Sequence, residues 1–229
     1  MSNSPVITID GPSGSGKGTI AFRLSKTLGW PILDSGAIYR VLGFAAHRSN
    51  LTPDQTEEIT ELARNLPLEF KTDDASNEVI AYLNDEPVGD LIRTDEAGQR
   101  ASQVASIPEV REALLQKQRD FNRAPGLIAD GRDMGTIVFP EAEAKVFLTA
   151  SAETRASRRY NQLKQKGIDA NLAAILESIK ARDERDRTRT VAPLVPAGGA
   201  FVVDSSSLSA DEVFSQVLDY VTEKLQESS

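Results

Sequence analysis

The sequence predicts an α/β protein with three layers, in which a central parallel sheet of five strands is covered by helices. Three observations support this fold class. Five short apolar segments recur along the chain, helical spacing of apolar residues separates them, and the first segment ends in a glycine-rich turn that opens directly into a helical pattern. Parallel strands need crossover connections, so strands that alternate with helices imply one sheet buried between helical layers.

The expected strands are short and rich in β-branched residues, as buried parallel strands are. They lie at residues 5–10, 31–33, 126–129, 144–148 and 200–203. After the first strand, Ile20, Leu24 and Leu28 recur every four residues before Gly29. This spacing predicts a helix that starts at the glycine turn and packs one stripe inward.

The last helix has its own start signal. Ser209 and Glu212 have the spacing of a capping box, in which each side chain hydrogen-bonds the backbone of the other residue. Apolar residues then follow at helical spacing, at Val213, Val217, Val221 and Leu225. We expect this helix to close the fold.

Residues 67–95 have a different pattern. Two segments rich in aromatic and β-branched residues, 68–71 and 79–83, flank the turn-rich segment 73–77, and Glu86–Gly89 follows them. This pattern predicts a small antiparallel β insert. A disordered loop is the alternative, and the aromatic and β-branched content disfavours it.

The composition predicts one domain over residues 1–229, because a chain of 229 residues with 40% apolar side chains supports one sizeable core. The chain has no cysteine and one histidine, His47, which excludes disulfide scaffolds, thiol nucleophiles and cysteine-based zinc sites. No window approaches the roughly 20 apolar residues of a membrane span, so we expect a cytoplasmic protein without a membrane partner. The net charge of −8 argues against binding to a nucleic-acid polymer.

Residues 11–19 form a phosphate-loop motif. The segment fits the pattern G-x-x-x-x-G-K between a strand and a helix, with the residues Gly11, Pro12, Ser13, Gly14, Ser15, Gly16, Lys17, Gly18 and Thr19. The glycines let backbone N–H groups surround a phosphate, the helix start adds its dipole and Lys17 adds a positive charge. A glycine-rich turn that binds nothing is the alternative, which the flanking strand, the lysine and the helix disfavour.

The residue after Lys17 departs from the general motif. Gly18 stands where a serine or threonine usually contacts Mg²⁺, and the hydroxyl comes one residue later, at Thr19. Because Mg²⁺ gives up its water reluctantly, we expect phosphate oxygens and water to hold it, with Thr19 as the candidate protein contact. The chain has no Asn-Lys-x-Asp guanine motif, which disfavours a GTPase switch.

Arginines are the main candidates for binding phosphate groups outside the phosphate loop, because a guanidinium binds phosphate through two parallel hydrogen bonds and stays charged. The candidates are Arg40, Arg111, Arg132, Arg158 with Arg159, and the run of residues 182–189. For any single arginine, a solvated surface salt bridge is the alternative.

One helix predicted near the end of the chain changes from apolar to charged along its inward stripe. The apolar part consists of Leu172, Ile175, Leu176 and Ile179. The same spacing continues to Arg182, Asp186 and Arg189, whereas Arg185 and Arg187 point elsewhere. Charged side chains are rarely buried without partners, so we expect this end to face a polar cleft in which Asp186 holds the two arginines.

Two acidic turns follow predicted strands. Asp34 and Ser35 come after the second strand, and the segment 130–133 comes after the third. Asp34 or Ser35 can be an ordinary helix cap, and the second turn can be structural. The carboxyl edge of a parallel sheet is also where ligands bind, so both turns are candidate site segments.

Five segments together resemble bacterial cytidylate kinases: residues 11–19, 34–40, 101–105 with 110–111, 128–136 and 182–193. The resemblance extends from about residue 5 to about residue 225, and the β insert matches it in the monophosphate-binding region. It implies a P-loop kinase fold and transfer of the terminal phosphoryl of ATP to CMP or dCMP with Mg²⁺. It also implies a short lid at residues 155–168, and we expect a monomer.

The resemblance also implies roles for individual residues. Lys17 and its loop would hold the ATP phosphates, and Arg40 and Arg132 would hold the acceptor phosphate. Cytosine would be read by Ser102, Arg111 and Asp133, and the sugar would be held by Arg182 and Asp186. Ser35 and Tyr39 complete the acceptor set. Arg189, with Arg158 and Arg159, would approach the transferred phosphoryl when the lid closes, so the catalytic set is Lys17, Arg132, Arg158 and Arg189.

Two other interpretations stay open at this stage. The acceptor could be adenylate, thymidylate or shikimate, because the phosphate loop does not separate these kinases. The protein could instead be a regulatory module that binds ATP without transferring its phosphoryl group. The several cationic groups outside the loop favour transfer, since a loose phosphoryl transition state is stabilised mainly by positioning and positive charge.

Overall fold

The computed structural model describes residues 4–73 and 78–227. The chain divides into two compact units, and each is described by itself. The first unit combines Met1–Asp34 with Arg119–Ser229, and the second is Ser35–Gln118.

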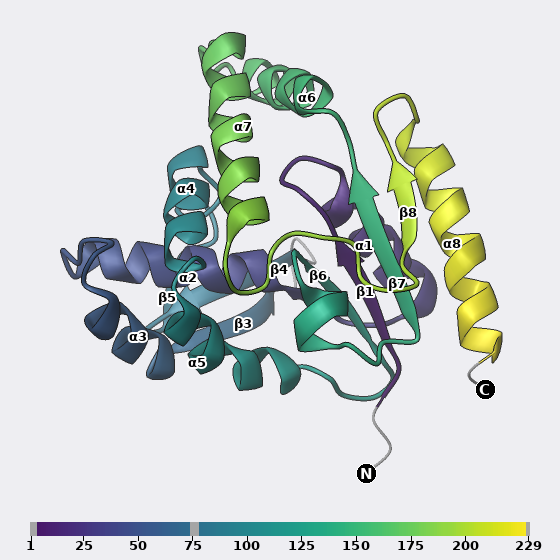
Figure 1. Ribbon diagram of the computed structural model, residues 1–229, viewed down its shortest axis with the longest axis horizontal. Coiled ribbons are helices and arrows are strands. Elements are labelled where there is room, and N and C mark those ends of the chain that lie inside the picture. Colours follow the sequence, from purple (N-terminus) through teal and green to yellow (C-terminus); the bar gives the residue numbers. More distant parts are fainter. Residues whose placement is uncertain (1–3, 74–77, 228–229) are drawn as a thin grey trace. The chain divides into compact units, whose positions relative to one another are not determined.

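The first unit is built on a five-stranded parallel sheet (Figure 1). Its strands are β1 (Val6–Asp10), β2 (Ile32–Asp34), β6 (Leu127–Gly131), β7 (Ala144–Thr149) and β8 (Phe201–Asp204). They lie in the order β2-β6-β1-β7-β8, and every pair is parallel. The predicted number of strands and their parallel direction are confirmed. The order places β1 at the centre, so the loop that follows β1 leaves from the middle of the sheet.

The helices of this unit are α1 (Lys17–Leu28), α6 (Ala152–Gln165), α7 (Leu172–Thr188) and α8 (Ala210–Glu227), with a π-helical turn, η1 (Met134–Val138). Helices α1 and α8 pack on one shared core with the sheet. Ile20 and Leu24 of α1 and Val217 of α8 are buried there against Ile9 and Val146 of the strands. The predicted inward stripes of the first and last helices are therefore confirmed.

The start of α8 confirms the predicted capping box. The backbone N–H of Ser209 donates to Glu212 Oε2 over 2.8 Å, and the Glu212 N–H donates to Ser209 Oγ over 3.2 Å. These two bonds satisfy donors that the first turn of a helix leaves without partners.

The described part of the second unit contains four helices and an antiparallel sheet. The helices are α2 (Ser35–Arg48), α3 (Thr56–Arg64), α4 (Asp95–Val104) and α5 (Pro108–Arg119). The strands are β3 (Leu68–Asp73), β4 (Glu78–Leu83) and β5 (Glu86–Pro87), in the order β3-β4-β5. This sheet confirms the antiparallel insert, although residues 74–77 of its predicted turn lie outside the described residues.

Helices α2 and α4 pack closely because of a glycine. A Cβ atom at Gly43 would lie 3.0 Å from the Cβ of Arg100 and 3.2 Å from the backbone nitrogen of Ala101. A larger side chain at this position would push α4 away from α2. This contact sets the distance between the helix that carries Tyr39 and Arg40 and the helix that carries Ser102.

The apolar stripe predicted for α7 is only partly inward. Ile175, Leu176 and Ile179 are half-buried, whereas Leu172 is 43% exposed, so the prediction for Leu172 is wrong. Helix α7 packs mainly on α6, which lies next to the upper end of α7 in Figure 1. A pair of helices covers only part of each stripe, and Leu172 is the first residue of α7, where cover is least.

Candidate functional site

The loop between β1 and α1 has the geometry that the phosphate-loop motif predicts. Its first and last glycines have positive φ angles, 148° at Gly11 and 101° at Gly16, which residues with a side chain rarely adopt. A Cβ atom at Gly11 would lie 2.0 Å from the carbonyl oxygen of Leu148 in β7. Only glycine therefore lets the loop turn this tightly against the sheet and lead into α1.

Lys17 is the first residue of α1, and it lies back over its own loop. The residue is buried, and its Nζ donates to the carbonyl oxygen of Pro12 over 2.9 Å. The same Nζ lies 4.0 Å from Oδ1 of Asp130. Burial lowers the pKa of Lys17 to about 8, helped by the charge of Arg132 and opposed by that of Asp130. The amine is therefore still protonated at neutral pH, so a cation sits within the loop.

Three aspartates lie at the carboxyl ends of the adjacent strands β2, β6 and β1: Asp34 and Asp10 are the last residues of β2 and β1, and Asp130 is the second-last residue of β6. The sheet register pairs Asp34 with Asp130, and Asp130 with Ile9, the neighbour of Asp10. Burial raises the pKa of Asp130 to about 6; the charge of Lys17 opposes this shift and the charge of Asp34 adds to it. The carboxyl edge of the sheet therefore carries acidic groups beside the loop cation, as expected for the two acidic turns.

Asp10 is a site residue that the sequence analysis missed. It is buried, and its two carboxylate oxygens each accept a backbone N–H over 2.8 Å, from Met134 and from Gly135. Burial raises its pKa to about 7, and the two N–H donors offset part of the rise. These hydrogen bonds attach the turn that carries Arg132 and Asp133 to the end of β1. A charged residue that ends an otherwise apolar, fully buried strand is the sequence signal that could have found it.

The predicted cluster at the end of α7 is present. The helix extends to Thr188, so Arg182 and Asp186 both lie on it, and Arg189 follows directly. Asp186 is buried, and its Oδ2 accepts a hydrogen bond from Nε of Arg132 over 2.9 Å. Burial would raise the pKa of Asp186, but the charges of Arg132, Arg182 and Arg189 hold it below its usual range.

The prediction named Arg182 and Arg189 as the partners of Asp186, and the structure adds Arg132 from the turn after β6. The structure thus brings four of the predicted site residues together in one cluster, namely Arg132, Arg182, Asp186 and Arg189.

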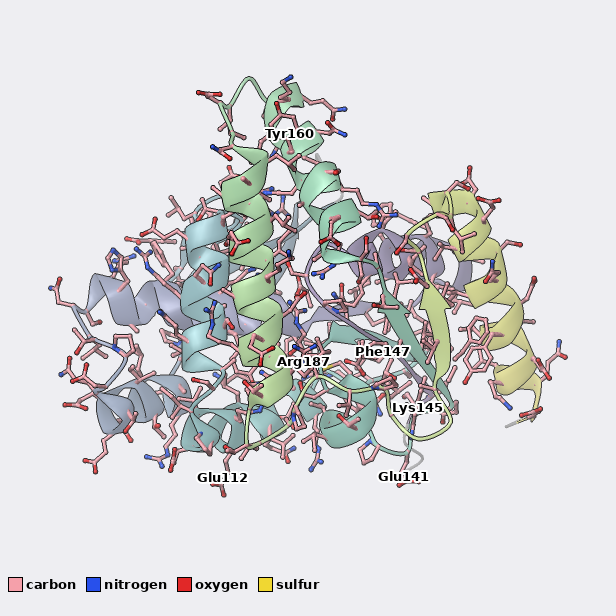
Figure 2. The ribbon with its side chains drawn as sticks, turned by 45° about the horizontal axis from the view of Figure 1, so that its top comes forward. Glu112, Glu141, Lys145, Phe147, Tyr160 and Arg187 are labelled. Carbon is pink, nitrogen blue, oxygen red and sulfur yellow. The ribbon has the colours of Figure 1, made fainter. Side chains whose placement is uncertain are left out.

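Arg187 fits the predicted helical wheel, whereas Arg185 is half-buried. Arg187 is exposed and pairs with Glu184 one turn earlier, and Figure 2 labels it on the C-terminal half of α7. The same figure labels Tyr160 on α6, within the predicted lid.

Arg158 of the predicted lid donates from Nη2 to the carbonyl oxygen of Ser205 over 2.6 Å. The Ser205 hydroxyl in turn donates to the carbonyl oxygen of Ser15 in the phosphate loop over 3.0 Å.

The remaining acceptor candidates, apart from Asp133, lie in the second unit. The guanidinium of Arg111 lies 5.4 Å from the centre of the Tyr39 ring and donates to the carbonyl oxygen of Ala105 over 3.2 Å. Arg40 donates to the carbonyl oxygens of Ile92 and Thr94, over 2.7 and 3.0 Å. Ser102 is buried on α4, and Asp133, from the first unit, is also buried.

Ser35 has a structural partner in the same unit. Its hydroxyl donates to Oε1 of Gln118 over 2.7 Å, and both residues are buried. This bond joins the start of α2 to α5. As a candidate substrate contact, Ser35 would first have to give up this bond or share its oxygen.

The metal prediction rests on few protein groups. Thr19 is exposed in the first turn of α1. Across residues 4–73 and 78–227, no three or more His, Cys, Asp or Glu side chains group so that they could hold a metal ion. In the same part of the chain, no helix is long and apolar enough to cross a membrane.

Comparison with known proteins shows the family. The family model for cytidylate kinase matches residues 7–223. A cytidylate kinase of Colwellia psychrerythraea is 53% identical over 223 residues, which cover 97% of this chain and 98% of that protein. One from Shewanella putrefaciens is 55% identical over 226 residues, covering 99% of this chain and 98% of that protein.

Among solved structures, a shikimate kinase from Bacteroides thetaiotaomicron matches 97% of this chain and 98% of its own. Its TM-score is 0.43 and its sequence identity 13%, values too low to carry an argument. The family match and the two relatives over nearly the whole chain decide the assignment. The chain belongs to the cytidylate kinase family, and it is an ATP-dependent nucleoside monophosphate kinase that phosphorylates CMP or dCMP.

Proposed function

We propose that the protein transfers the terminal phosphoryl group of Mg²⁺-bound ATP to CMP or dCMP, and that the residues described above carry out this transfer. The observation that supports the residue roles best is the position of Lys17. Its amine lies in the phosphate loop, 4.0 Å from Asp130, and the charge of Arg132 is close enough to lower its pKa. Cations from two separate segments thus act on one place, as phosphoryl transfer requires.

The donor side is assigned to the phosphate loop. Backbone N–H groups of residues 11–19 and the start of α1 bind the ATP phosphates, and Lys17 supplies the positive charge. Lys17 now donates to the carbonyl oxygen of Pro12, so a phosphate oxygen would replace that acceptor. Arg132, Arg158 and Arg189 are the further candidates for stabilising charge on the transferred group.

The residues present fit Mg²⁺ bound mainly through phosphate. Mg²⁺ prefers oxygen donors and often keeps several waters, so it needs few protein contacts. The Thr19 hydroxyl, exposed in the first turn of α1, is a donor of this kind. When bound, the ion neutralises charge on the triphosphate, and the protein's own cations then act on what remains.

The chain's own residues do not need to supply a strong base. The attacking oxygen belongs to a phosphate that is already an anion at neutral pH, so positioning and positive charge can supply most of the rate. Asp10 and Asp130 are therefore assigned to holding the site together. Asp10 fixes the turn of Arg132, and Asp130 faces Lys17.

The acceptor side is assigned residue by residue. In the second unit, Arg40, with Ser35 and Tyr39, is proposed for the acceptor phosphate, and Ser102 and Arg111 are proposed for cytosine. In the first unit, Arg132 is also proposed for the acceptor phosphate. Asp133 is proposed to accept from the cytosine amino group, and Arg182 and Asp186 to hold the sugar. The burial of Ser102, Arg111 and Asp133 supports base recognition, because buried polar groups discriminate strongly between hydrogen-bond patterns.

The proposed setting is a monomer in the cytoplasm with free nucleotides as its partners. The net charge of −8 supports small anions bound in a local basic site over a nucleic-acid polymer on the surface.

Replacing Lys17 tests the role of the loop. Lys17→Ala removes a cation that is worth about 3 kcal/mol in the transition state, so kcat with ATP and CMP should fall at least a hundredfold. The matched control is Lys26→Ala, which removes an exposed lysine from the same helix and should leave kcat unchanged. A folded Lys17→Ala protein with near-normal turnover would show that the loop is wrongly assigned.

A further inference from the structure

Arg155 is almost completely buried, although it lies in the first turn of α6, within the predicted lid. Its Nε donates to the carbonyl oxygen of Ala150 at the end of β7 over 2.9 Å. Its Nη1 donates to the carbonyl oxygen of Ser13 over 3.1 Å and to Asp183 Oδ1 over 3.0 Å, and its Nη2 donates to Asp183 Oδ2. One guanidinium therefore joins the end of β7, the phosphate loop and α7.

The phosphate loop lies directly against this side chain. A Cβ atom at Gly14 would be 3.4 Å from the Cβ of Arg155, so the loop backbone rests on the aliphatic part of the arginine. Helix α7 reaches the loop a second time, because Nη1 of Arg182 donates to Oγ of Ser13 over 3.4 Å. Two successive residues of α7, Arg182 and Asp183, are thus linked to Ser13, the first directly and the second through Arg155.

This connection determines where the charged end of α7 lies. One turn after Asp183, Asp186 holds Arg132 through its hydrogen bond of 2.9 Å. The location of the α7 charges relative to the phosphate loop therefore depends on how α7 is held at Ser13. The helix dipole disfavours a cation in the first turn of a helix, so Arg155 needs the specific partners that hold it there, unlike an ordinary surface arginine.

We propose that Arg155 is a positioning residue for phosphoryl transfer. It holds α7 against the phosphate loop, through Asp183 and Ser13, so that the cations of α7 are aligned with the donor phosphates. Arg155 itself does not touch the substrate. The proposal rests on the proposed function, in which the loop binds ATP and the α7 cations act on the phosphoryl group.

The proposal also changes which residues we expect to move as the lid. Arg155 is buried and has partners in three segments, so it stays with the loop and β7, and any lid motion begins after the first turn of α6. The moving part would lie within residues 156–168 instead of starting at Arg155.

The test compares two pairs that join the same two helices. Arg155→Lys keeps the charge but cannot reproduce the planar set of hydrogen bonds, and Asp183→Asn keeps the shape but removes the charge. Glu153→Gln is the matched control, because Glu153 pairs with Lys180 across the same helices over 3.6 Å at an exposed position. Steady-state kinetics with ATP and CMP and thermal unfolding are measured for five proteins: the wild type, the three single variants and the double variant Arg155→Lys/Asp183→Asn.

We expect kcat to fall at least tenfold in Arg155→Lys and in Asp183→Asn, with each KM changed less than about threefold, because alignment matters most in the transition state. The kcat of the double variant should be no lower than that of the worse single variant, because both residues act through one connection. Glu153→Gln should keep normal kcat. A folded Arg155→Lys protein with kcat within twofold of the wild type would overturn the proposal, as would an equal loss in Glu153→Gln.

Two further measurements distinguish a failure of this proposal from a failure of the variant to fold and from a failure of the proposed function. If Arg155→Lys does not fold, the same criteria apply to Asp183→Asn. Hydrogen exchange of the α7 amides without nucleotide does not depend on any activity: it should speed up in Arg155→Lys and not in Glu153→Gln. Unchanged hydrogen exchange in a folded Arg155→Lys protein would refute the positioning role. If the wild type were inactive on CMP but α7 still exchanged faster in Arg155→Lys, the proposed function alone would be refuted.

Discussion

Replacement of Asp186 by alanine is the sharpest perturbation of the charged end of α7. Asp186 is 3% exposed, and its carboxylate accepts from Nε of Arg132 over 2.9 Å. The alanine variant removes the acceptor and leaves Arg132, whose side chain is 17% exposed, without its strongest partner. The charges of Arg182 and Arg189 also lose the negative group that offsets their mutual repulsion.

The expected loss of unfolding free energy in Asp186→Ala is large because a buried charge loses its partner. Removing one member of a buried ion pair typically costs about 3–5 kcal/mol of unfolding free energy. Arg187→Ala is the control on the same helix. Arg187 is exposed and pairs only with Glu184 among the described contacts, so removing its side chain should change the unfolding free energy by no more than about 0.5 kcal/mol.

Urea unfolding and steady-state kinetics measure the two effects separately. Asp186→Ala should lower the urea midpoint and raise the KM for CMP, and Asp186→Asn, which keeps one acceptor oxygen, should show smaller changes in both. Arg187→Ala should match the wild type in each assay. If Asp186→Ala and Arg187→Ala behave alike, the location of Asp186 within the cluster does not have the role assigned to it.

Asp10→Asn gives a prediction about pH. Because burial raises the pKa of Asp10 from 3.8 to about 7, its contribution to stability is complete below pH about 4 and is lost as the pH rises through 7. The unfolding free energy of the wild type minus that of Asp10→Asn should therefore fall by about 4 kcal/mol from pH 4 to pH 8, and a flat difference would contradict the burial argument. Asp133→Asn should lower kcat/KM for CMP and narrow the preference for CMP over UMP, since an amide both donates and accepts; an unchanged ratio would remove Asp133 from base recognition. Replacing residues 68–87 by a short linker should weaken CMP binding more than binding of a fluorescent ATP analogue, provided that circular dichroism shows a folded protein, and equal losses would argue against a role in acceptor binding.

Local patterns predicted the parts of the fold in which neighbours in sequence are neighbours in space. The turn from β1 through the phosphate loop to α1 follows from glycines and helical spacing within residues 5–29. The capping box at Ser209 and Glu212 is equally local, and the structure contains both of its hydrogen bonds. Such features need no knowledge of the rest of the chain.

Contacts between distant segments were not predictable in the same way. The helical wheel placed Asp186 on the inward side of α7, but no pattern showed that Arg132, 54 residues away, would be its partner. Arg155 and Ser13 are separated by 142 residues, and in the sequence Arg155 looks like one more charge in a surface helix. Leu172 was assigned to an inward stripe because periodicity cannot show how much of a helix its neighbours cover.

The relative rates with different monophosphates test the central claim most directly. The initial rate of ADP formation from ATP and Mg²⁺ would be measured over a range of concentrations of CMP, dCMP, UMP and AMP, which gives kcat/KM for each. If buried polar groups read the cytosine edge, an unsatisfied group costs about 1–3 kcal/mol or more when charged, so kcat/KM for CMP or dCMP should exceed that for UMP by at least tens of fold. A protein that used UMP or AMP as well as it used CMP would contradict this account.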